Sequence, residues 1–181
     1  MHLLTISGSL RAVSSNTTLL DAVALVAPDD LHVTRYDGLA ELPPFNPDLD
    51  VEPAHPAVTR YRAALVAADA IVISSPEYAH GVPGVLKNAL DWVVGSGELI
   101  AKPIAVLNPS PFSGFAYPQL VETLTVMSAR VILEASITLR VSGRQLDAQA
   151  IAADPELAGP LREALGALAR AASDGTAGDA R

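Results

Sequence analysis

Short, mostly apolar runs alternate along the chain with longer stretches in which apolar residues recur every three or four positions. The runs lie at residues 3–6, 31–36, 70–74, 103–107 and 131–139, and such runs are typical of strands that are buried on both faces of a sheet. The periodic stretches predict helices over residues 17–26, 57–68, 83–94, 118–127 and 155–171. Because strands and helices alternate, the pattern predicts a doubly wound α/β fold. Its five-stranded parallel sheet should have the order 2-1-3-4-5, with helices on both faces.

Two segments lack this periodicity. Residues 37–55 are rich in proline and polar residues, and we expect them to form a long loop. Residues 172–181 follow the last periodic helix, and we expect them to be a disordered tail. No linker or internal repeat separates the remaining elements, so residues 1–171 are interpreted as a single domain, for which this length is common.

The loops that follow the first, third and fourth strands carry the candidate chemistry, since ligands bind such sheets beyond the carboxyl ends of the strands. The first loop offers hydroxyl, amide and guanidinium groups directly ahead of a helix: Ser9, Arg11, Ser14, Ser15, Asn16 and Thr17. A helix start presents unpaired N–H groups and a partial positive charge. Together with these side chains it suits the dianion of a terminal phosphate monoester. The alternative is that Ser14, Asn16 and Thr17 only cap the helix.

Two patterns that would indicate other phosphate ligands are missing from this loop. It has no lysine in the GxxxxGK[ST] arrangement, which disfavours triphosphate hydrolysis, and no GxGxxG, which disfavours a dinucleotide site of the common kind. Its serines also have no histidine and carboxylate partners visible in the sequence, which disfavours nucleophilic hydrolysis.

The second and third loops could hold a flat ring. Residues 75–84 contain two prolines and two glycines, which give a rigid backbone, and Tyr78 and His80 offer aromatic cover. In residues 108–115, Phe112, Phe115 and the N–H groups of Ser113 and Gly114 could meet a ring system, and Ser110 lies beside them. The alternatives are that the second loop only links a strand to a helix and that the two phenylalanines fill the core.

Composition and charge exclude several classes of protein. The chain has no cysteine, which excludes disulfides, thiolate metal sites and cysteine nucleophiles, and its four scattered histidines predict no metal site. A net charge of −8 argues against a nucleic-acid binder, and two lysines provide no polybasic membrane patch. The first residues lack the charged start of a signal peptide, so we expect a cytoplasmic protein.

Three segments together resemble the NADPH-dependent FMN reductase family, which includes quinone, azo-dye and chromate reductases. They are GSLRAVSSN at 8–16, LPPFNPDLD at 42–50 and SPEYAHGVPGVLKNALDW at 75–92, and the likeness extends over residues 2–140. The resemblance implies a flavodoxin-like fold with bound FMN. It places the FMN phosphate at Ser9, Arg11, Ser14 and Asn16, and the isoalloxazine ring along Pro76, Glu77, Tyr78 and Gly81.

The chain departs from the family pattern at two places. Many members have an aromatic residue where this chain has Ser15, and many have SPGxxGG where this chain has SPFSGF. The second departure bears on access to the flavin and therefore on the choice of acceptor.

The expected function is an FMN-dependent NAD(P)H oxidoreductase that passes electrons to a quinone, an azo compound, free flavin or a metal oxyanion. No catalytic side chain is expected, because the flavin N5 carries the chemistry; the donor is NADPH or NADH. Helix 83–94 is apolar on two sides, and the resemblance implies a homodimer through it, with a tetramer as an alternative. Trp92 could instead pack under the 37–55 loop. Two other functions stay open: a flavodoxin-type electron carrier and a non-flavin module that binds a phosphate ligand.

Overall fold

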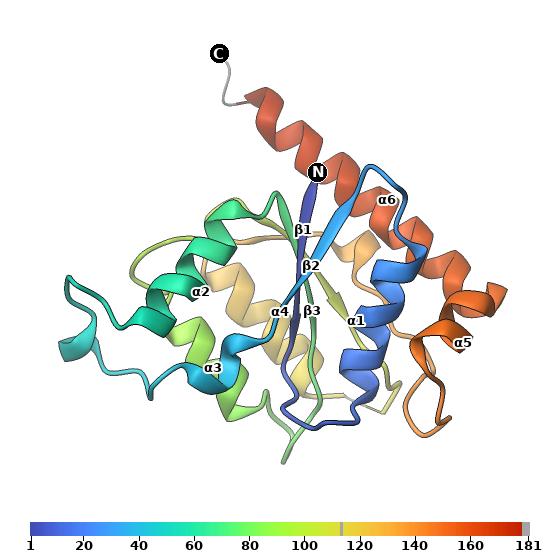
Figure 1. Cartoon of the computed structure of the whole chain (residues 1–181), viewed down its shortest axis with the longest axis horizontal. Helices are drawn as coiled ribbons and strands as arrows, with labels where there is room; N and C mark the ends of the chain where they lie inside the picture. The colour runs from blue at the N-terminus through green and yellow to red at the C-terminus, as the bar shows by residue number, and fades with distance from the viewer. Residues whose placement is uncertain (113, 179–181) are drawn as a thin grey trace.

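Five parallel strands form one sheet in the computed structural model, which describes residues 1–112 and 114–178. In chain order the strands are β1 (His2–Ser7), β2 (His32–Tyr36), β3 (Ala70–Ser74), β4 (Pro103–Leu107) and β5 (Arg130–Val131). Their order across the sheet is β2-β1-β3-β4-β5 and every neighbouring pair is parallel (Figure 1). The predicted doubly wound topology is therefore confirmed.

Helices cover both faces of the sheet (Figure 1). On one face lie α1 (Ser15–Val26), α5 (Ala148–Ala153) and α6 (Pro155–Gly178), and on the other lie α2 (Pro56–Ala67), α3 (Gly84–Asp91) and α4 (Ala116–Val126). Short 3-10 helices occur at η1 (Gly38–Glu41), η2 (Pro47–Leu49) and η3 (Leu133–Ala135).

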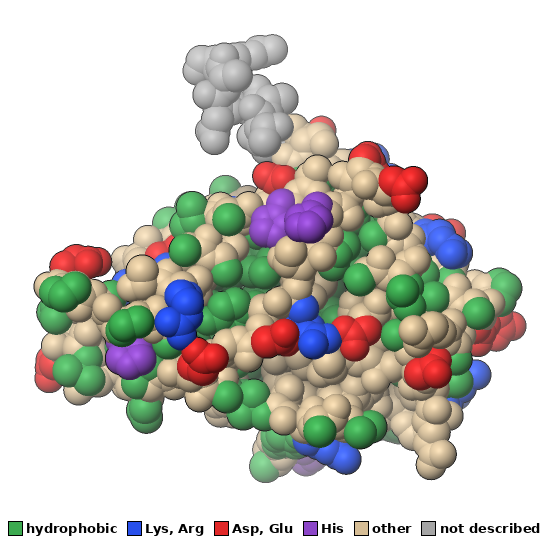
Figure 2. Space-filling view, viewed as in Figure 1, with side chains coloured by type: hydrophobic (Ala, Val, Ile, Leu, Met, Phe, Trp, Pro, Cys, Tyr) green, Lys and Arg blue, Asp and Glu red, His purple; other side chains and the backbone are tan. Residues whose placement is uncertain are grey.

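The surface carries both signs of charge. Acidic and basic side chains are interspersed on the face drawn in Figure 2, and no basic patch stands out there. Among the described residues, no helix is both long and apolar enough to cross a membrane.

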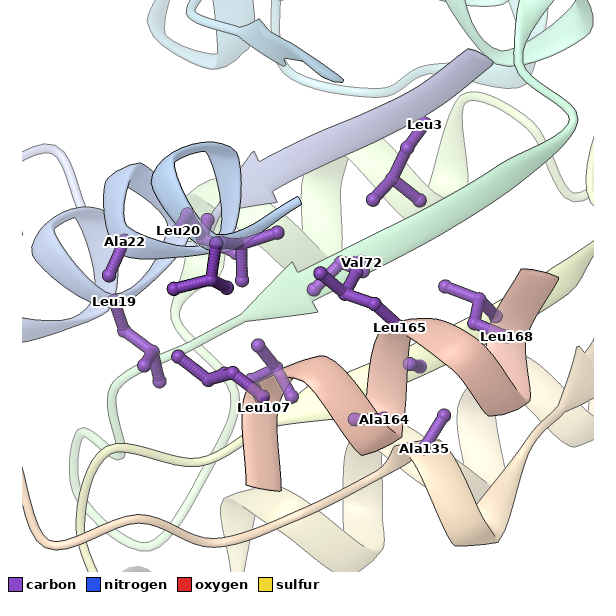
Figure 3. Close-up of a cluster of buried hydrophobic side chains, with 14 of the residues drawn as sticks. Leu3, Leu19, Leu20, Ala22, Val72, Leu107, Ala135, Ala164, Leu165 and Leu168 are labelled. Atoms are coloured by element: carbon purple, nitrogen blue, oxygen red, sulfur yellow. The ribbon is translucent and has the colours of Figure 1, made fainter. Parts of the chain in front are cut away.

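Successive residues of each central strand supply two separate cores. Leu3 and Val72 belong to the core beneath α1 and α6, whereas Leu4 and Ile71 belong to the core beneath α2, α3 and α4. Figure 3 shows the first core, in which Leu165 and Leu168 of α6 lie against the sheet. Successive side chains of a strand point to opposite faces of the sheet. A strand whose successive residues are all apolar must therefore be covered by helices on both faces.

The C-terminal region differs from its prediction. α6 runs to Gly178, past the predicted end at Ala171, and α5 was not predicted. Ala171 and Ala172 are buried and the carbonyl of Ala171 accepts a hydrogen bond from the Arg130 guanidinium at 3.0 Å, so packing continues the helix into the segment expected to be a tail. Residues 179–181 of that segment lie outside the described residues.

The prediction of a fifth strand over 131–139 is wrong after Val131. The chain leaves the sheet in η3 and returns as a single bridge between Asn108 and Thr138. The side chain of Ser136 fills the gap, because its Oγ accepts the N–H of Val106 at 3.0 Å and donates to the carbonyl of Ile132 at 2.8 Å. The apolar run at 131–139 therefore includes a short segment that leaves the sheet, and the Ser136 hydroxyl takes the place of a backbone hydrogen-bond partner there.

Trp92 lies under the 37–55 loop and is 1% exposed. Its Nε1 donates to the carbonyl of Pro43 at 2.8 Å, and its ring meets Phe45 edge-on with centroids 5.1 Å apart. The side-chain amide of Asn88 also binds this loop. It donates to the Pro43 carbonyl at 3.0 Å and accepts the Phe45 N–H at 2.7 Å. The apolar residues on this side of α3 are therefore covered within the chain, as in the second interpretation of Trp92.

Candidate cofactor site

The three predicted loops meet at the carboxyl edge of the sheet and enclose a cleft of about 230 Å³, called here the three-loop cleft. The first loop lies between β1 and α1, the second between β3 and α3, and the third between β4 and α4. The lining residues are Ser9, Arg11, Ser14, Ser15, Asn16, Ser75, Pro76, Glu77, Tyr78, Pro109, Ser110 and Ser142.

Close backbone contact holds the first and second loops together. The N–H of Gly8 donates to the carbonyl of Ser74 at 2.8 Å, and a Cβ at Gly8 would come within 2.6 Å of Ser75 Oγ and 3.0 Å of its Cβ. The buried Ser74 hydroxyl donates to Asn16 Oδ1 at 2.9 Å. Asn16 and Ser74 therefore fix the start of α1 against the end of β3.

Residues with hydrogen-bond donors line the cleft from the first loop. Ser14 is 6% exposed and occupies the N-cap position of α1, but its side chain makes no capping bond to the helix. Arg11 is exposed at the cleft wall, and its own N–H donates to Ser9 Oγ at 3.3 Å. The first turn of α1 has no acidic residue. A hydroxyl, a guanidinium and the N–H groups of a helix start are thus available together for an anion.

Glu77 ties the second loop to the third. Its Oε2 accepts the N–H of Ala116 at 2.9 Å and that of Phe115 at 2.8 Å, at the start of α4. These two backbone hydrogen bonds, Ala116 first, hold the pKa of the Glu77 carboxyl below its ordinary value, and the charge of His80 adds to the effect. Glu77 therefore stays ionised as a helix cap at the mouth of the cleft.

One aromatic residue, Tyr78, lines the cleft. Tyr78 is 52% exposed, and in and after the third loop Phe115 is 56% exposed and Phe112 is 90% exposed, so none of these rings fills the core. The His80 ring stacks on Phe115 with centroids 4.1 Å apart. His80 and Ala79 have φ angles of 60° and 49° in the tight turn that Tyr78 and Gly81 close with two 3.0 Å hydrogen bonds, a turn that favours glycine and asparagine.

The site has the donors for a phosphate and open space beside a rigid loop, but few groups for acid–base catalysis. No group of three histidine, aspartate or glutamate side chains that could hold a metal occurs in the part of the chain that the structure describes. The donor set fits FMN, whose terminal phosphate needs several hydrogen bonds and whose ring needs a flat wall.

Comparison with known proteins agrees with this chemistry. The model of the NADPH-dependent FMN reductase family matches residues 1–141. The chain belongs to this family. An NAD(P)H-dependent FMN reductase of Pseudomonas aeruginosa is 32% identical over 173 residues, which are 93% of each chain. The quinone reductase of Escherichia coli is 33% identical over 113 residues, which are 61% of this chain and 60% of that protein.

A solved structure shows the same architecture. FerB, a flavoenzyme NAD(P)H:(acceptor) oxidoreductase of Paracoccus denitrificans, superposes with a TM-score of 0.75 and 26% identity, over 93% of this chain and 97% of that one. This FMN reductase family member is thus a flavodoxin-like oxidoreductase that uses FMN and NAD(P)H. The flavodoxin-type carrier and the non-flavin module are no longer needed to explain the sequence.

Most of the predicted site residues of this family member lie at the three-loop cleft. The ones that line it are Ser9, Arg11, Ser14, Ser15, Asn16, Pro76, Glu77, Tyr78 and Ser110. Thr17 instead shares a 2.9 Å hydrogen bond with the Ser7 hydroxyl, and Gly81, Phe112 and Gly114 are not among the lining residues. Ser113 lies outside the described residues.

Three lining residues of this FMN reductase family member were missed: Ser75, Pro109 and Ser142. Ser75 and Pro109 belong to loops that the sequence singles out. Ser142 reaches the cleft because its N–H and that of Val141 donate to the Pro109 carbonyl at 2.9 and 3.1 Å. No motif marks this contact, which depends on how the chain returns to the sheet after η3.

Proposed function

We propose that FMN lies in the three-loop cleft, with its phosphate at the first loop and its ring against the second and third loops. The observation that carries this assignment is Ser14, an almost buried residue that lines the cleft together with Arg11 and whose side chain makes no capping bond to α1. A capping serine would normally use its oxygen on the helix N–H groups. Ser9, Asn16 and the N–H groups at the start of α1 complete the phosphate site in this proposal.

The loops orient the ring and limit the chemistry at its edge. Bound FMN supplies electron transfer between the nicotinamide nucleotide and the acceptor. Pro76 and Tyr78 provide a wall whose position depends on the capping bonds of Glu77 to α4. The exposed rings of Tyr78, Phe112 and Phe115 offer a stacking surface, which favours planar acceptors such as quinones over metal oxyanions.

A titration and a kinetic experiment test this function. Purified or reconstituted protein should bind one FMN per chain with flavin absorption bands, and FAD should bind less tightly. Because donor and acceptor must reach the same exposed rim, NAD(P)H oxidation with a quinone should give parallel double-reciprocal lines. Intersecting lines would contradict a shared rim, and preference for FAD would contradict the assignment of the first loop to a terminal phosphate.

The proposal includes a homodimer in the cytoplasm, where reduced nicotinamide nucleotides are supplied. Although Trp92 is covered, exposed Val94, Ile100 and Val126 line a groove of about 430 Å³ between α3 and α4. Contiguous exposed apolar surface of this kind favours association, and the groove includes residues of the helix that the sequence singles out for pairing. We assign a second copy of the chain to it; residues 1–171 of each copy would act as one FMN domain.

A further inference from the structure

A second cleft, of about 360 Å³, lies on the opposite side of the first loop from the FMN site. Its walls come from the first loop, the carboxyl ends of β1 and β2, and η1. Ser9 and Arg11 line both this second cleft and the three-loop cleft. The FMN assignment uses Ser9 and Arg11 but none of the residues that line this cleft from β2, Asp37 and η1.

The chemistry of the second cleft differs from that of the phosphate site. Asp37 follows β2 directly and brings a carboxylate to the wall, and an acidic residue at the end of the second strand of a doubly wound sheet is suited to accept hydrogen bonds from ribose hydroxyls. The half-buried ring of Tyr36, with Leu39 and Ala40, adds aromatic and apolar surface for a purine. The volume is within the usual range for a small-ligand pocket.

Charge in the second cleft selects between nucleotides. Arg35 is held between two carboxylates: its Nε lies 2.6 Å from Asp37 Oδ1, and its NH1 pairs with Asp21. In Figure 2, basic and acidic side chains lie side by side over β2. The Arg35 charge is thus already balanced, and a phosphate on the ribose 2′-oxygen would face Asp37. Arg11, in contrast, has no ion-pair partner among the described residues and stands where a 5′-phosphate would leave the cleft.

We propose that the second cleft binds the adenosine 5′-phosphate half of a dinucleotide whose ribose 2′-hydroxyl is free. The proposal rests on the function assigned above, because the nicotinamide of a donor held in the second cleft must reach the FMN in the three-loop cleft. The dinucleotide is the electron donor NADH, so the protein should prefer NADH to NADPH.

The test starts from the FMN-loaded protein and uses two nucleotide probes in calorimetric titrations. The wild type should bind one 5′-AMP per chain, and 2′,5′-ADP should bind about tenfold more weakly or worse because its 2′-phosphate meets Asp37. Asp37→Asn should narrow that difference. Ala40→Trp should fill the second cleft and weaken 5′-AMP binding about tenfold or more. Ala63→Trp is the matched control, since Ala63 is an exposed alanine of α2 and lines neither cleft.

A further arm tests the donor directly. Competition between NADH and 5′-AMP on the FMN-loaded protein, removed by Ala40→Trp, supports NADH as the ligand of the second cleft, and the FMN affinity of Ala40→Trp should be unchanged. NADH binding that does not compete with 5′-AMP overturns the assignment of the donor to this cleft. Absence of saturable 5′-AMP binding, or 5′-AMP binding that Ala40→Trp leaves unchanged, overturns the proposal. Failure of the FMN titration would instead overturn the proposed function, and 5′-AMP binding to the apo protein would still test the second cleft.

Discussion

At the scale of single residues, a substitution of Arg11 tests whether this arginine binds phosphate or is an ordinary surface residue. Arg11→Ala should weaken FMN binding roughly ten- to a hundredfold, because a charge-assisted hydrogen bond contributes about 1.5–3 kcal/mol. The apo melting temperature should hardly change, since the side chain is exposed. Ser14→Ala should cost less FMN affinity, as water can partly replace a neutral hydroxyl. Calorimetric titration of both variants gives the comparison, and unchanged affinity in Arg11→Ala would leave the backbone N–H groups as the main phosphate site.

Gly8 is a second residue whose identity the site requires. An added Cβ would lie 2.6 Å from Ser75 Oγ and 3.1 Å from Leu86 Cδ2, so Gly8→Ala must move the second loop away from the first. We expect a loss of about 1–3 kcal/mol in the free energy of unfolding, together with weaker FMN binding. Gly159→Ala is the control: no atom lies within 4 Å of the added Cβ, and alanine should stabilise α6 by up to about 1 kcal/mol. Equal melting temperatures for wild type and Gly8→Ala would show that the first and second loops can move apart without a loss of stability.

Glu77 gives a prediction about pH. Its carboxyl has a lowered pKa in the folded chain, so its contribution to stability is present above the ordinary glutamate pKa of about 4.3 and is lost as pH falls through the lowered value. Glu77→Gln should therefore melt below wild type at pH 7, and the difference should shrink in acid. Thermal melts from pH 7 to about pH 3, with the exposed Glu163→Gln as control, measure it. A difference that persists unchanged in acid would show that the carboxylate charge plays no part.

At the scale of elements, the 37–55 loop depends on a partly buried ion cluster. One guanidinium nitrogen of Arg62 donates to both carboxylate oxygens of Asp50 at 2.9 Å and to the Trp92 carbonyl at 2.6 Å, and Arg62 Nε lies 3.5 Å from Glu98. The Arg62 side chain is 17% exposed and that of Glu98 is 9% exposed. Removing Arg62 would leave the nearly buried Glu98 carboxylate without a cation, with the Ser96 hydroxyl as a hydrogen-bond donor at 2.6 Å.

Arg62→Ala should accordingly lower the free energy of unfolding by roughly 3 kcal/mol. Arg60→Ala provides a control on the same helix, because the Arg60–Glu41 pair is more than half exposed on both sides and should contribute less than about 1 kcal/mol. Chemical denaturation of both variants measures the difference. If the two variants lose the same stability, the cluster does not anchor the loop.

The elements that the sequence predicts well are those whose pattern matches one physical requirement. β3 and β4 are buried along their whole length and were located at their observed ends. The strand prediction is wrong after β5 for a specific reason. The hydroxyl of Ser136 replaces a backbone hydrogen-bond partner of Val106, and the pattern of apolar residues does not indicate such a replacement. Trp92 shows a related limit, since its apolar ring predicts burial but not whether the 37–55 loop or a second subunit supplies the cover.

At the scale of the whole molecule, topology explains why the position of the three-loop cleft could be predicted from the sequence. Parallel strands bring the ends of β1, β3 and β4 to one edge, so three loops far apart in sequence must meet there. Ser142 and the second cleft could not be located in the same way. They depend on the path of the chain after η3 and on the position of η1 beside Asp37, which are set by tertiary contacts and not by local periodicity.

The last prediction concerns assembly. Val94, Ile100 and Val126 are 61%, 64% and 75% exposed around the groove between α3 and α4, and a second copy would remove this apolar surface from water. Val126→Glu would place a charge in that contact, where it would lack a partner. We expect a dimer for the wild type and a monomer for Val126→Glu in light-scattering measurements. The apo melting temperature, measured at matched low protein concentration, should stay similar because Val126 is exposed in the single chain.

Val66→Glu is the matched control for this experiment. Val66 is an α2 valine that is 65% exposed, and it does not line the groove. The same change of charge and size is therefore made on an equally accessible valine outside the proposed contact, and the dimer should persist. A monomeric wild type, or dissociation by both variants alike, would contradict pairing through α3 and α4. If the dimer persists in Val126→Glu, the two copies meet through another surface and the apolar groove needs a different occupant.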